Sequence, residues 1–390
     1  MPPIYLDYNA TTPIDPAVAD AMEPFLREHF GNPSCTHSLG QAAHQAVDIA
    51  RQQVASLLKA EADEIVFTGG GTEASNHAIK GSLFALLREG FLDAIRNARI
   101  VTTAIEHPAT LQPCAFLKRL GATVVHVPVD GYGIVDLDAM RKAIVPGTTI
   151  VSVMHSNNEV GTLQPVREIA AMAHDAGALM HTDAAQTLGK VPADVKSLGV
   201  DLLSVAGHKV YASKGVGCLF VRRGVALEPL LHGAGHEAGR RAGTENVPHI
   251  VGLGKACEIA RESLPAASER LRSLRDRLWR LLRDGLGDRI ALNGHPDLRL
   301  PNTLNVNFLG RIGAELLAKT PAVAASTGSA CHEGHVSLSP VLKAMGVSPE
   351  AGKGAIRLTV GRYTTEEEID RSAEALLRTA NDREWSSRSA

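Results

Sequence analysis

Short apolar runs alternate along the first 220 or so residues with segments whose apolar positions recur at helical spacing. Short β-branched runs predict buried strands, and recurrence every three to four residues predicts amphipathic helices. The predicted strands are 64–68, 100–103, 123–129, 149–154, 179–182, 202–205 and 218–221. The predicted helices begin near Pro16, Gln41, Thr72, Pro108, Leu137 and Pro165. This alternation predicts an α/β fold in which helices cover both faces of a mostly parallel sheet.

The pattern changes after Gly243. A long helical stretch from about Ile250 to Leu286 is leucine-rich on one face and charged on the other. Short strands at 304–308 and 355–360 follow, with helices from Arg311, Ser339 and Thr365. We therefore expect a large domain of residues 16–247 and a smaller α+β domain of residues 1–15 and 248–390. The polar tail after Asn381 is expected to be loose.

Composition narrows the class of protein. Hydrophobic residues make up 44% and charged residues 21% of the 390 positions, as in ordinary globular proteins. A net charge of −2 gives no electrostatic reason to expect nucleic acid or an anionic membrane as a partner. The N-terminus lacks a basic and apolar leader, and the five cysteines are widely spaced without a CxxC pair. We expect a cytoplasmic protein without disulfides, a metal site or a membrane span.

One lysine is the first candidate for chemistry. In the stretch Asp201–Gly215, an apolar β-branched run enters a turn that carries His208, Lys209 and Tyr211. A lysine at the end of a buried strand loses hydration, which lowers its pKa and makes the neutral amine available to form a Schiff base. The ordinary alternative is an exposed lysine at a strand end.

A phosphate site is the second candidate. The segment from Glu64 to Glu73 reads as a strand, a run of three glycines and the start of a helix near Thr72. Loop amides and the positive end of the helix dipole both face an anion in such an arrangement. A tight turn without a ligand would use the same glycines.

Polar residues also stand at the ends of several predicted strands. They are Glu106 and His107, Asn157 and Asn158, Asp183 and Gln186, and His208 and Lys209. Ligands in open α/β sheets collect beyond the carboxyl ends of the strands. A buried aspartate such as Asp183 needs a cation, and a protonated pyridine nitrogen would supply one. Each residue alone is compatible with a satisfied polar group of the core, but together with the lysine they predict a site.

With these residues in place, the chain resembles the pyridoxal-phosphate-dependent cysteine desulfurases of the class V aminotransferase superfamily, whose relatives include the selenocysteine lyases. The resemblance covers nearly the whole chain and implies the fold type I of pyridoxal-phosphate-dependent transferases. The matching stretches are Tyr5–Pro13, Phe30–Ser34, Phe67–Glu73, Glu106–His107, Asn157–Gly161, His181–Gln186, Gly207–Lys209, Arg241–Thr244, Gly328–Cys331 and Ile356–Arg362.

The resemblance implies a role for each matching residue toward the cofactor. Lys209 would hold pyridoxal phosphate as a Schiff base, His107 would stack on its ring, and Asp183 would pair with the pyridine nitrogen. Asn158 and Gln186 would contact ring substituents, with Gln186 at the phenolic oxygen. The residues implied to hold the phosphate are Gly71, Thr72 and His208, joined by Thr244 from the other subunit of a homodimer.

The resemblance also implies how the substrate, L-cysteine, is bound and cleaved. Arg357 would clamp its carboxylate with a bidentate fork, assisted by Asn32 and Asn158. Lys209 would take the α-proton and His107 would act as proton donor or shuttle. The Cys331 thiolate would attack the substrate sulfur, which leaves alanine and a persulfide for an acceptor such as an iron–sulfur scaffold or a tRNA-thiolation protein.

Cys331 differs from the other four cysteines in its surroundings. It lies in Ala324–His335, a segment of small residues with His332 and His335, which we interpret as an exposed, mobile loop whose histidines favour the thiolate. The apparent length of this loop predicts direct sulfur transfer without an obligatory activator. The remaining cysteines are typical of small core residues.

Several features depart from the family pattern or leave other functions open. Ala206 stands where many desulfurases have a serine that bonds the phosphate, Ala212–Ser213 replaces Gly-Pro, and Gly233–Ala238 replaces a glycine-rich run ending in arginine. Cys331–His332 and the segment Gly243–Asn246 are more similar to the matching segments of selenocysteine lyases than to those of housekeeping desulfurases. L-Selenocysteine is therefore an alternative substrate. An aminotransferase of the same fold, or a cofactor-binding scaffold for sulfur-transfer partners, are further alternatives.

Overall fold

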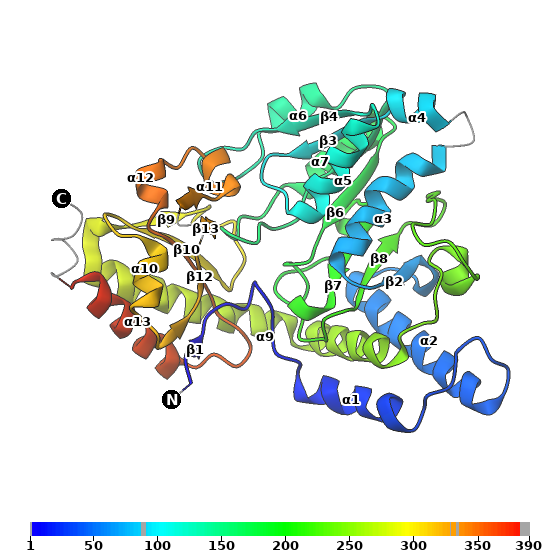
Figure 1. Ribbon diagram of the computed structural model, residues 1–390, viewed down its shortest axis with the longest axis horizontal. Helices are drawn as coiled ribbons and strands as arrows, with labels where there is room; N and C mark the ends of the chain where they lie inside the picture. Colours follow the sequence, from blue (N-terminus) through cyan, green and yellow to red (C-terminus); the bar gives the residue numbers. More distant parts are fainter. Residues whose placement is uncertain (1, 87–90, 328, 333–334, 383–390) are drawn as a thin grey trace.

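The structure is a computed structural model that describes residues 2–86, 91–327, 329–332 and 335–382. It contains a central sheet covered by helices and a second, antiparallel sheet, and the long helix α9 (Val247–Leu286) runs from one to the other (Figure 1). The proposed division into domains at residues 15 and 247 stays a prediction, although the two sheets have separate apolar cores.

The central sheet has seven strands in the order β2-β8-β7-β6-β5-β3-β4. Their bounds are β2 Ile65–Thr68, β3 Arg99–Thr103, β4 Thr123–Val127, β5 Thr148–Ser152, β6 Leu179–Asp183, β7 Leu202–Ala206 and β8 Gly217–Val221. The neighbours from β7 to β4 are parallel, whereas β8 runs antiparallel to both β7 and β2. The predicted mostly parallel sheet is therefore confirmed.

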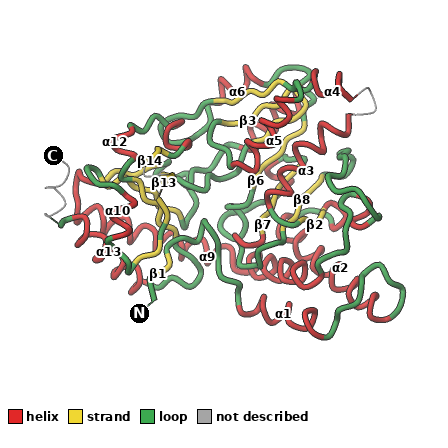
Figure 2. Tube along the Cα trace, viewed as in Figure 1, coloured by secondary structure: helices red, strands yellow, loops and turns green. Residues whose placement is uncertain are grey.

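Helices cover both faces of this sheet because successive strand residues point to opposite sides. Ile100 and Ile150 belong to the apolar cluster under α3, α4 and α5, while Val101 and Val151, one residue later, belong to the cluster on the other face. Figure 2 shows the helices on either side of the strands. The helices of this part are α1 Pro16–Arg27, α2 Ser38–Leu58, α3 Gly71–Phe84, α4 Phe91–Asn97, α5 Pro108–Arg119, α6 Leu137–Ala143, α7 Val166–Asp175 and α8 Val195–Leu198.

The second sheet has four strands in the order β12-β15-β10-β9, paired antiparallel. Its strands are β9 Ile290–Asn293, β10 Thr303–Phe308, β12 Ser326–Thr327 and β15 Ala355–Thr359, accompanied by α10 Gly313–Ala318, α11 Pro340–Ala344, α12 Pro349–Gly352 and α13 Glu366–Ala380. The N-terminal β1 (Ile4–Tyr5) pairs in parallel with β11 (Val323–Ala324), which places the start of the chain beside this sheet.

The interpretation of Ala324–His335 as a loop is wrong for much of its length. After β11 and β12, Ser329–His332 forms β13, which pairs antiparallel with β14 (His335–Leu338) and places Cys331 opposite Val336. The side chain of Cys331, and with it the expected exposure and mobility, lies outside the described residues. Residues 328, 333 and 334 and the tail from 383 onward lie outside them as well.

Among the described helices, none is both long enough and apolar enough to cross a membrane. The longest, α9, has 40 residues but alternates buried and charged positions. Its first half lies against α1 and α2 in the core of the central sheet, and its second half contributes Leu271, Leu274, Leu278 and Leu282 to the core of the second sheet.

The close approach of α9 to α2 predicts that Gly254→Ala destabilises the protein. A Cβ at Gly254 would lie 2.6 Å from the Cα of Ala50, which is backbone and cannot move freely. The expected loss is about 1–3 kcal/mol, although alanine is the better helix former by about 1 kcal/mol.

Gly252→Ala is the matched control in the same helix. Its Cβ would meet mainly the flexible side chain of Met22, with the sulfur at 2.6 Å, so we expect little change or a small gain in stability. Thermal and denaturant unfolding of both variants measure the difference, and equal stabilities would contradict the packing argument.

Candidate active site

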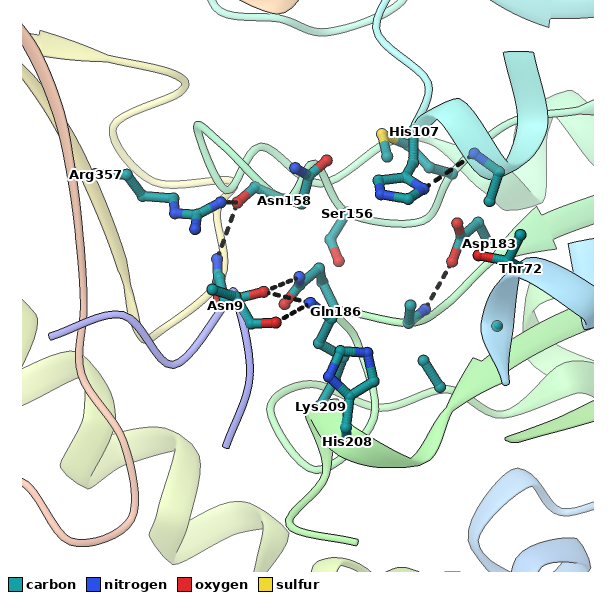
Figure 3. Close-up of a pocket in the computed structure, with 16 residues that line it drawn as sticks. Asn9, Thr72, His107, Ser156, Asn158, Asp183, Gln186, His208, Lys209 and Arg357 are labelled. Atoms are coloured by element: carbon teal, nitrogen blue, oxygen red, sulfur yellow. Dashed lines mark hydrogen bonds between the residues drawn. The ribbon is translucent and has the colours of Figure 1, made fainter. Parts of the chain in front are cut away.

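A cavity of about 340 Å³ lies at the carboxyl-end edge of the central sheet. Nine residues singled out from the sequence line it, although they come from segments up to 286 residues apart (Figure 3). They are Gly71, Thr72, His107, Asn158, Asp183, Gln186, His208, Lys209 and Arg357. For eight of these residues the convergence follows from central-sheet strands whose carboxyl ends share one edge, whereas Arg357 comes from the second sheet.

Lys209 follows β7 in a turn of 3₁₀ helix, Gly207–Lys209. Its Nζ donates to the backbone carbonyl oxygens of Asn9 at 2.7 Å and Ala10 at 2.6 Å. Burial, and next the nearby charge of Arg357, lower the pKa of Lys209 to about 8. A lysine of this pKa is partly neutral near neutral pH, as a nucleophilic amine must be, and the role of Lys209 stays a prediction.

Asp183 ends β6 and is only 8% exposed. One carboxylate oxygen accepts from the amide of Ala185 at 2.9 Å, and within the described chain no cation forms an ion pair with it. Burial raises the pKa of Asp183, while His107 and Lys209 act in the opposite direction. A cation placed in the cavity would relieve this desolvation.

His107 is the N-cap of α5 and faces the cavity between Asn158 and Asp183 (Figure 3). Its Nδ1 accepts from the amide of Ala109 at 3.1 Å, so the neutral ring carries its proton on Nε2. Burial lowers the pKa of His107, which favours this neutral form near pH 7. The ring therefore offers a flat face and one N–H.

Two of the polar residues named from the sequence brace the site without lining it. Glu106 is buried and accepts from the amide of Met154 and the hydroxyl of Thr103, which ties the ends of β5 and β3 together. Burial raises the pKa of Glu106 to about 8. Asn157 holds its own turn by accepting from the amides of Glu159 and Val160.

The glycine turn leads directly into the cavity. Gly70 has φ of 145°, α3 begins at Gly71, and Gly71 and Thr72 line the cavity. The 14-residue α3 presents the positive end of its dipole there. His208 stands near them with a pKa lowered to about 4, chiefly by burial, so its ring is neutral. Ala206 also lines this region, so the departure from serine falls at the site itself.

Arg357 projects from β15 of the second sheet. Its Nη2 lies 2.8 Å from an oxygen of Asp7 and its Nη1 donates to the carbonyl of Asn158 at 3.0 Å. Its Nε is buried and has no hydrogen-bond partner within the described part of the chain. The other oxygen of Asp7 accepts from Ser326, which anchors the pair to β12.

Two residues expected at the site lie elsewhere in the single chain. Asn32 does not line the cavity, and its side chain accepts from the amide of Ser34 within its own loop. Thr244 lines a different cavity of about 230 Å³, together with Gly215 and Glu237. Thr244 was expected to act on the other subunit of a dimer, so its role and that of Asn32 stay predictions.

Four polar residues in or beside the site had no assigned role from the sequence: Asp7, Asn9, Ser156 and Lys190. Asp7 and Asn9 lie inside the matching stretch Tyr5–Pro13, but nothing in a local pattern places them beside a lysine about 200 positions later. Lys190 follows Gln186 by four residues, a spacing that brings side chains together in a helical turn. That spacing was the one feature of the sequence that indicated a contact between Lys190 and Gln186.

Comparisons with known proteins agree with this geometry. The model of the family described as "Aminotransferase class-V" matches residues 4–371. The chain is 48% identical to a cysteine desulfurase of Gluconacetobacter diazotrophicus (94% of this chain, 91% of the relative) and 44% identical to "Cysteine desulfurase IscS" of Dictyoglomus turgidum (96% and 94%). A solved NifS-like protein superposes with a TM-score of 0.89 at 37% identity, covering 96% of this chain and 98% of that one.

The chain belongs to the cysteine desulfurases of the class-V aminotransferase family. The expected family and the fold of pyridoxal-phosphate-dependent transferases are thereby confirmed. Members of this family depend on pyridoxal phosphate, so the cavity of this desulfurase can be tested for its fit to that cofactor.

The residues present fit the cofactor. Asp183 is a buried carboxylate without a cation in the described chain, which a pyridinium nitrogen would supply. The start of α3, with Gly71 and Thr72, suits a phosphate, and Lys209 offers an amine of lowered pKa to the same space. His107, Asn158, Gln186 and His208 complete the wall.

The surroundings of Lys209 predict opposite shifts of its pKa in two variants of the cofactor-free protein. Asp7→Asn removes a charge that raises this pKa and should move it below about 8, while Arg357→Gln removes a charge that lowers it and should move it upward. Acylation of Lys209 by a small reagent, followed by peptide mass spectrometry between about pH 6 and 11, measures the titration. Shifts of the same sign would contradict the proposed electrostatics.

Proposed function

We propose that this desulfurase removes sulfur from L-cysteine, releases L-alanine and keeps the sulfur as a persulfide on Cys331. The observation that carries the proposal is that one cavity holds the amine Lys209, the carboxylate Asp183 and the guanidinium Arg357. These groups suit, respectively, the cofactor aldehyde, its ring nitrogen and an amino-acid carboxylate. The names of the curated relatives support the same reaction.

Pyridoxal phosphate, when bound, supplies an electron sink for the negative charge that develops at the substrate α-carbon. The side chains of the protein position the substrate and move its protons. Arg357, which lines the cavity and is braced by Asp7, is the guanidinium available to the substrate carboxylate. Lys209, with a pKa of about 8, takes the α-proton, and the Nε2 proton of His107 is available for return to carbon.

Sulfur transfer balances without an added oxidant or reductant. The Cys331 thiolate attacks the substrate sulfur, a sulfur–sulfur bond forms, and the bond between sulfur and the substrate β-carbon breaks. The carbon fragment keeps the electron pair, gains a proton and leaves as alanine, so carbon is reduced while sulfur is oxidised to the persulfide level. The persulfide then passes its outer sulfur to an acceptor protein, for which an iron–sulfur scaffold or a tRNA-thiolation protein is our proposal.

The homodimer also belongs to the proposal. Thr244 lies away from the cavity of its own chain, beside Glu237 and Gly215. A second subunit that brings this loop to the phosphate end would complete the residues expected there. Size-exclusion chromatography with light scattering tests the dimer independently of activity.

The decisive experiment is incubation of the cofactor-loaded protein with L-cysteine. We expect stoichiometric alanine and a mass increase of one sulfur atom on the peptide that contains Cys331. Cys331→Ala should abolish both while leaving the cofactor spectrum unchanged. Cys35→Ala, which removes a half-buried free cysteine, is the matched control and should keep both.

The same assay separates the alternatives. Alanine formed from L-selenocysteine but not from L-cysteine would favour a lyase, and full activity of Cys331→Ala in amino transfer to a keto acid would favour an aminotransferase. Cofactor uptake without turnover of any amino acid would contradict the proposed reaction.

The fork of Arg357 predicts that Arg357→Lys raises the KM for L-cysteine about tenfold or more, with a smaller change in kcat. Lysine keeps the charge but loses the planar pair of donors, a difference of about 1.5–3 kcal/mol for a hydrogen bond to a charged group. Steady-state kinetics measure the change, and Arg299→Lys, a buried arginine that does not line the cavity, is the control. A fall in kcat at constant KM would contradict a carboxylate clamp.

A further inference from the structure

Lys190 is a buried cation for which the reaction described so far has no use. It lies in the turn after β6, is 5% exposed, and forms no ion pair within the described residues. Its Nζ donates to the side-chain oxygen of Gln186 at 2.8 Å and to that of Asn9 at 3.3 Å, both neutral groups. Because a buried charge without a counter-ion is costly, its retention needs an explanation.

Lys190 and the backbone oxygen of Asn9 together determine which way the Gln186 amide faces. An ammonium group only donates, so it selects the Oε1 of Gln186 and turns the NH₂ away from itself. One hydrogen of that NH₂ is given to the backbone oxygen of Asn9 at 2.9 Å. The other has no partner in the described chain, and Gln186 lines the cavity (Figure 3).

Asn9 holds the same arrangement from the other side. Its Oδ1 accepts from Lys190 and from Asn302 at 3.0 Å, and its Nδ2 donates to the hydroxyl of Thr303 at 2.9 Å. The backbone oxygen of Asn9 accepts from both Gln186 and Lys209. The amides of Asn9 and Gln186 are therefore each held by several bonds, and a flip of either would break them.

We propose that Lys190 is a positioning residue, which orients and polarises the Gln186 amide so that its free N–H donates to the phenolic oxygen of pyridoxal phosphate. The inference rests on the proposed function, since it assumes that the cofactor occupies this cavity. The positive charge at Oε1 strengthens the N–H as a donor along the chain from Lys190 through Gln186. It also favours the deprotonated form of the phenolic oxygen, which supplies the anion that Lys190 lacks.

The charged form of Lys190 is disfavoured unless an anion lies nearby. Burial, followed by the charges of Lys209 and Arg357, lowers the pKa of Lys190 well below its ordinary value. The charged or titratable groups that border the cofactor cavity itself are His107, Asp183, His208, Lys209 and Arg357, with Asp7 behind Arg357. Across the second cavity, Lys190 itself faces further charged or titratable groups, which are Tyr8, Asp15, Lys209, Tyr211, Arg270 and Arg362. Substitution at residue 190 changes none of these residues, so we expect a shift in the cofactor spectrum to report on Lys190.

Three substitutions separate the charge of Lys190 from its hydrogen bonds and its volume. Lys190→Met keeps the length of the side chain but removes charge and donors, Lys190→Gln keeps a donor without the charge, and Lys190→Arg keeps the charge. Lys190 also borders a second cavity of about 330 Å³, which gives room for the larger arginine.

The test is a pH titration of the visible spectrum of the cofactor-loaded protein without substrate. We expect the midpoint to rise by roughly one pH unit in Lys190→Met and Lys190→Gln, because a positive charge that favours proton loss is removed. Lys190→Arg should keep the wild-type midpoint. Arg299→Met is the matched control, since it removes another buried cation that lines neither cavity, and it should lower the Tm without moving the midpoint.

The outcomes are distinguishable from failure of the proposed function. Normal cofactor uptake with unchanged midpoints in the Met and Gln variants would overturn the role of Lys190, even if both lost stability. A wild-type protein that takes up no cofactor would instead overturn the proposed function and this inference together. If Lys190→Met does not fold, the comparison of the Gln and Arg variants decides.

Discussion

The site depends on the contact between Lys209 and the backbone carbonyls of Asn9 and Ala10. This contact joins the end of β7 to the N-terminal segment across about 200 residues. It replaces part of the hydration that the ammonium loses, but with neutral dipoles and not with a full negative charge. Lys209 is therefore held in place while its pKa stays low, which is the combination that a nucleophilic amine requires.

Other buried charged groups around the cavity also lack some of the partners that would compensate for their burial. Asp183 has an amide donor but no cation in the described chain, Lys190 has amide oxygens but no anion, and Arg357 keeps an unpaired Nε. Such groups cost stability, and the apolar layers on both faces of the central sheet offset the cost. The ring nitrogen of the cofactor would pair with Asp183, and its phenolic oxygen would provide a negative charge near Lys190. The substrate carboxylate would pair with Arg357.

The sequence predicted the parts of the fold that have a local signature. Strand and helix periods indicated the parallel sheet, and parallel strands made it possible to infer that residues as distant as His107 and Lys209 share one edge. The reversed direction of β8 was not predicted, because an apolar run reads the same in both directions. The hairpin of Ser329–His332 was missed because glycine, serine and alanine have weak strand propensity.

The roles of Asp7, Asn9 and Lys190 could not be inferred from the sequence for a common physical reason. Asp7 and Asn9 act through contacts made by a short N-terminal segment that has no period of its own, and Lys190 acts through Gln186. Their roles are visible only when the two sheets are brought together, because Asn9 is bonded to Asn302 and Thr303 near β10 as well as to Lys209 and Gln186.

The N-terminal segment also connects the groups that the proposed chemistry uses separately. Asp7 binds Arg357 with one oxygen and Ser326 with the other, and Ser326 begins β12, only a few residues before Cys331. Arg357 and Ser326 are moreover register partners on adjacent strands. Asp7 thus contacts both Arg357, the proposed partner of the substrate carboxylate, and β12, the strand that precedes the hairpin containing Cys331. If the substrate is bound as proposed, Asp7 helps to position both its carboxylate and the start of the segment that contains Cys331. This shared contact limits the movement of the two relative to each other.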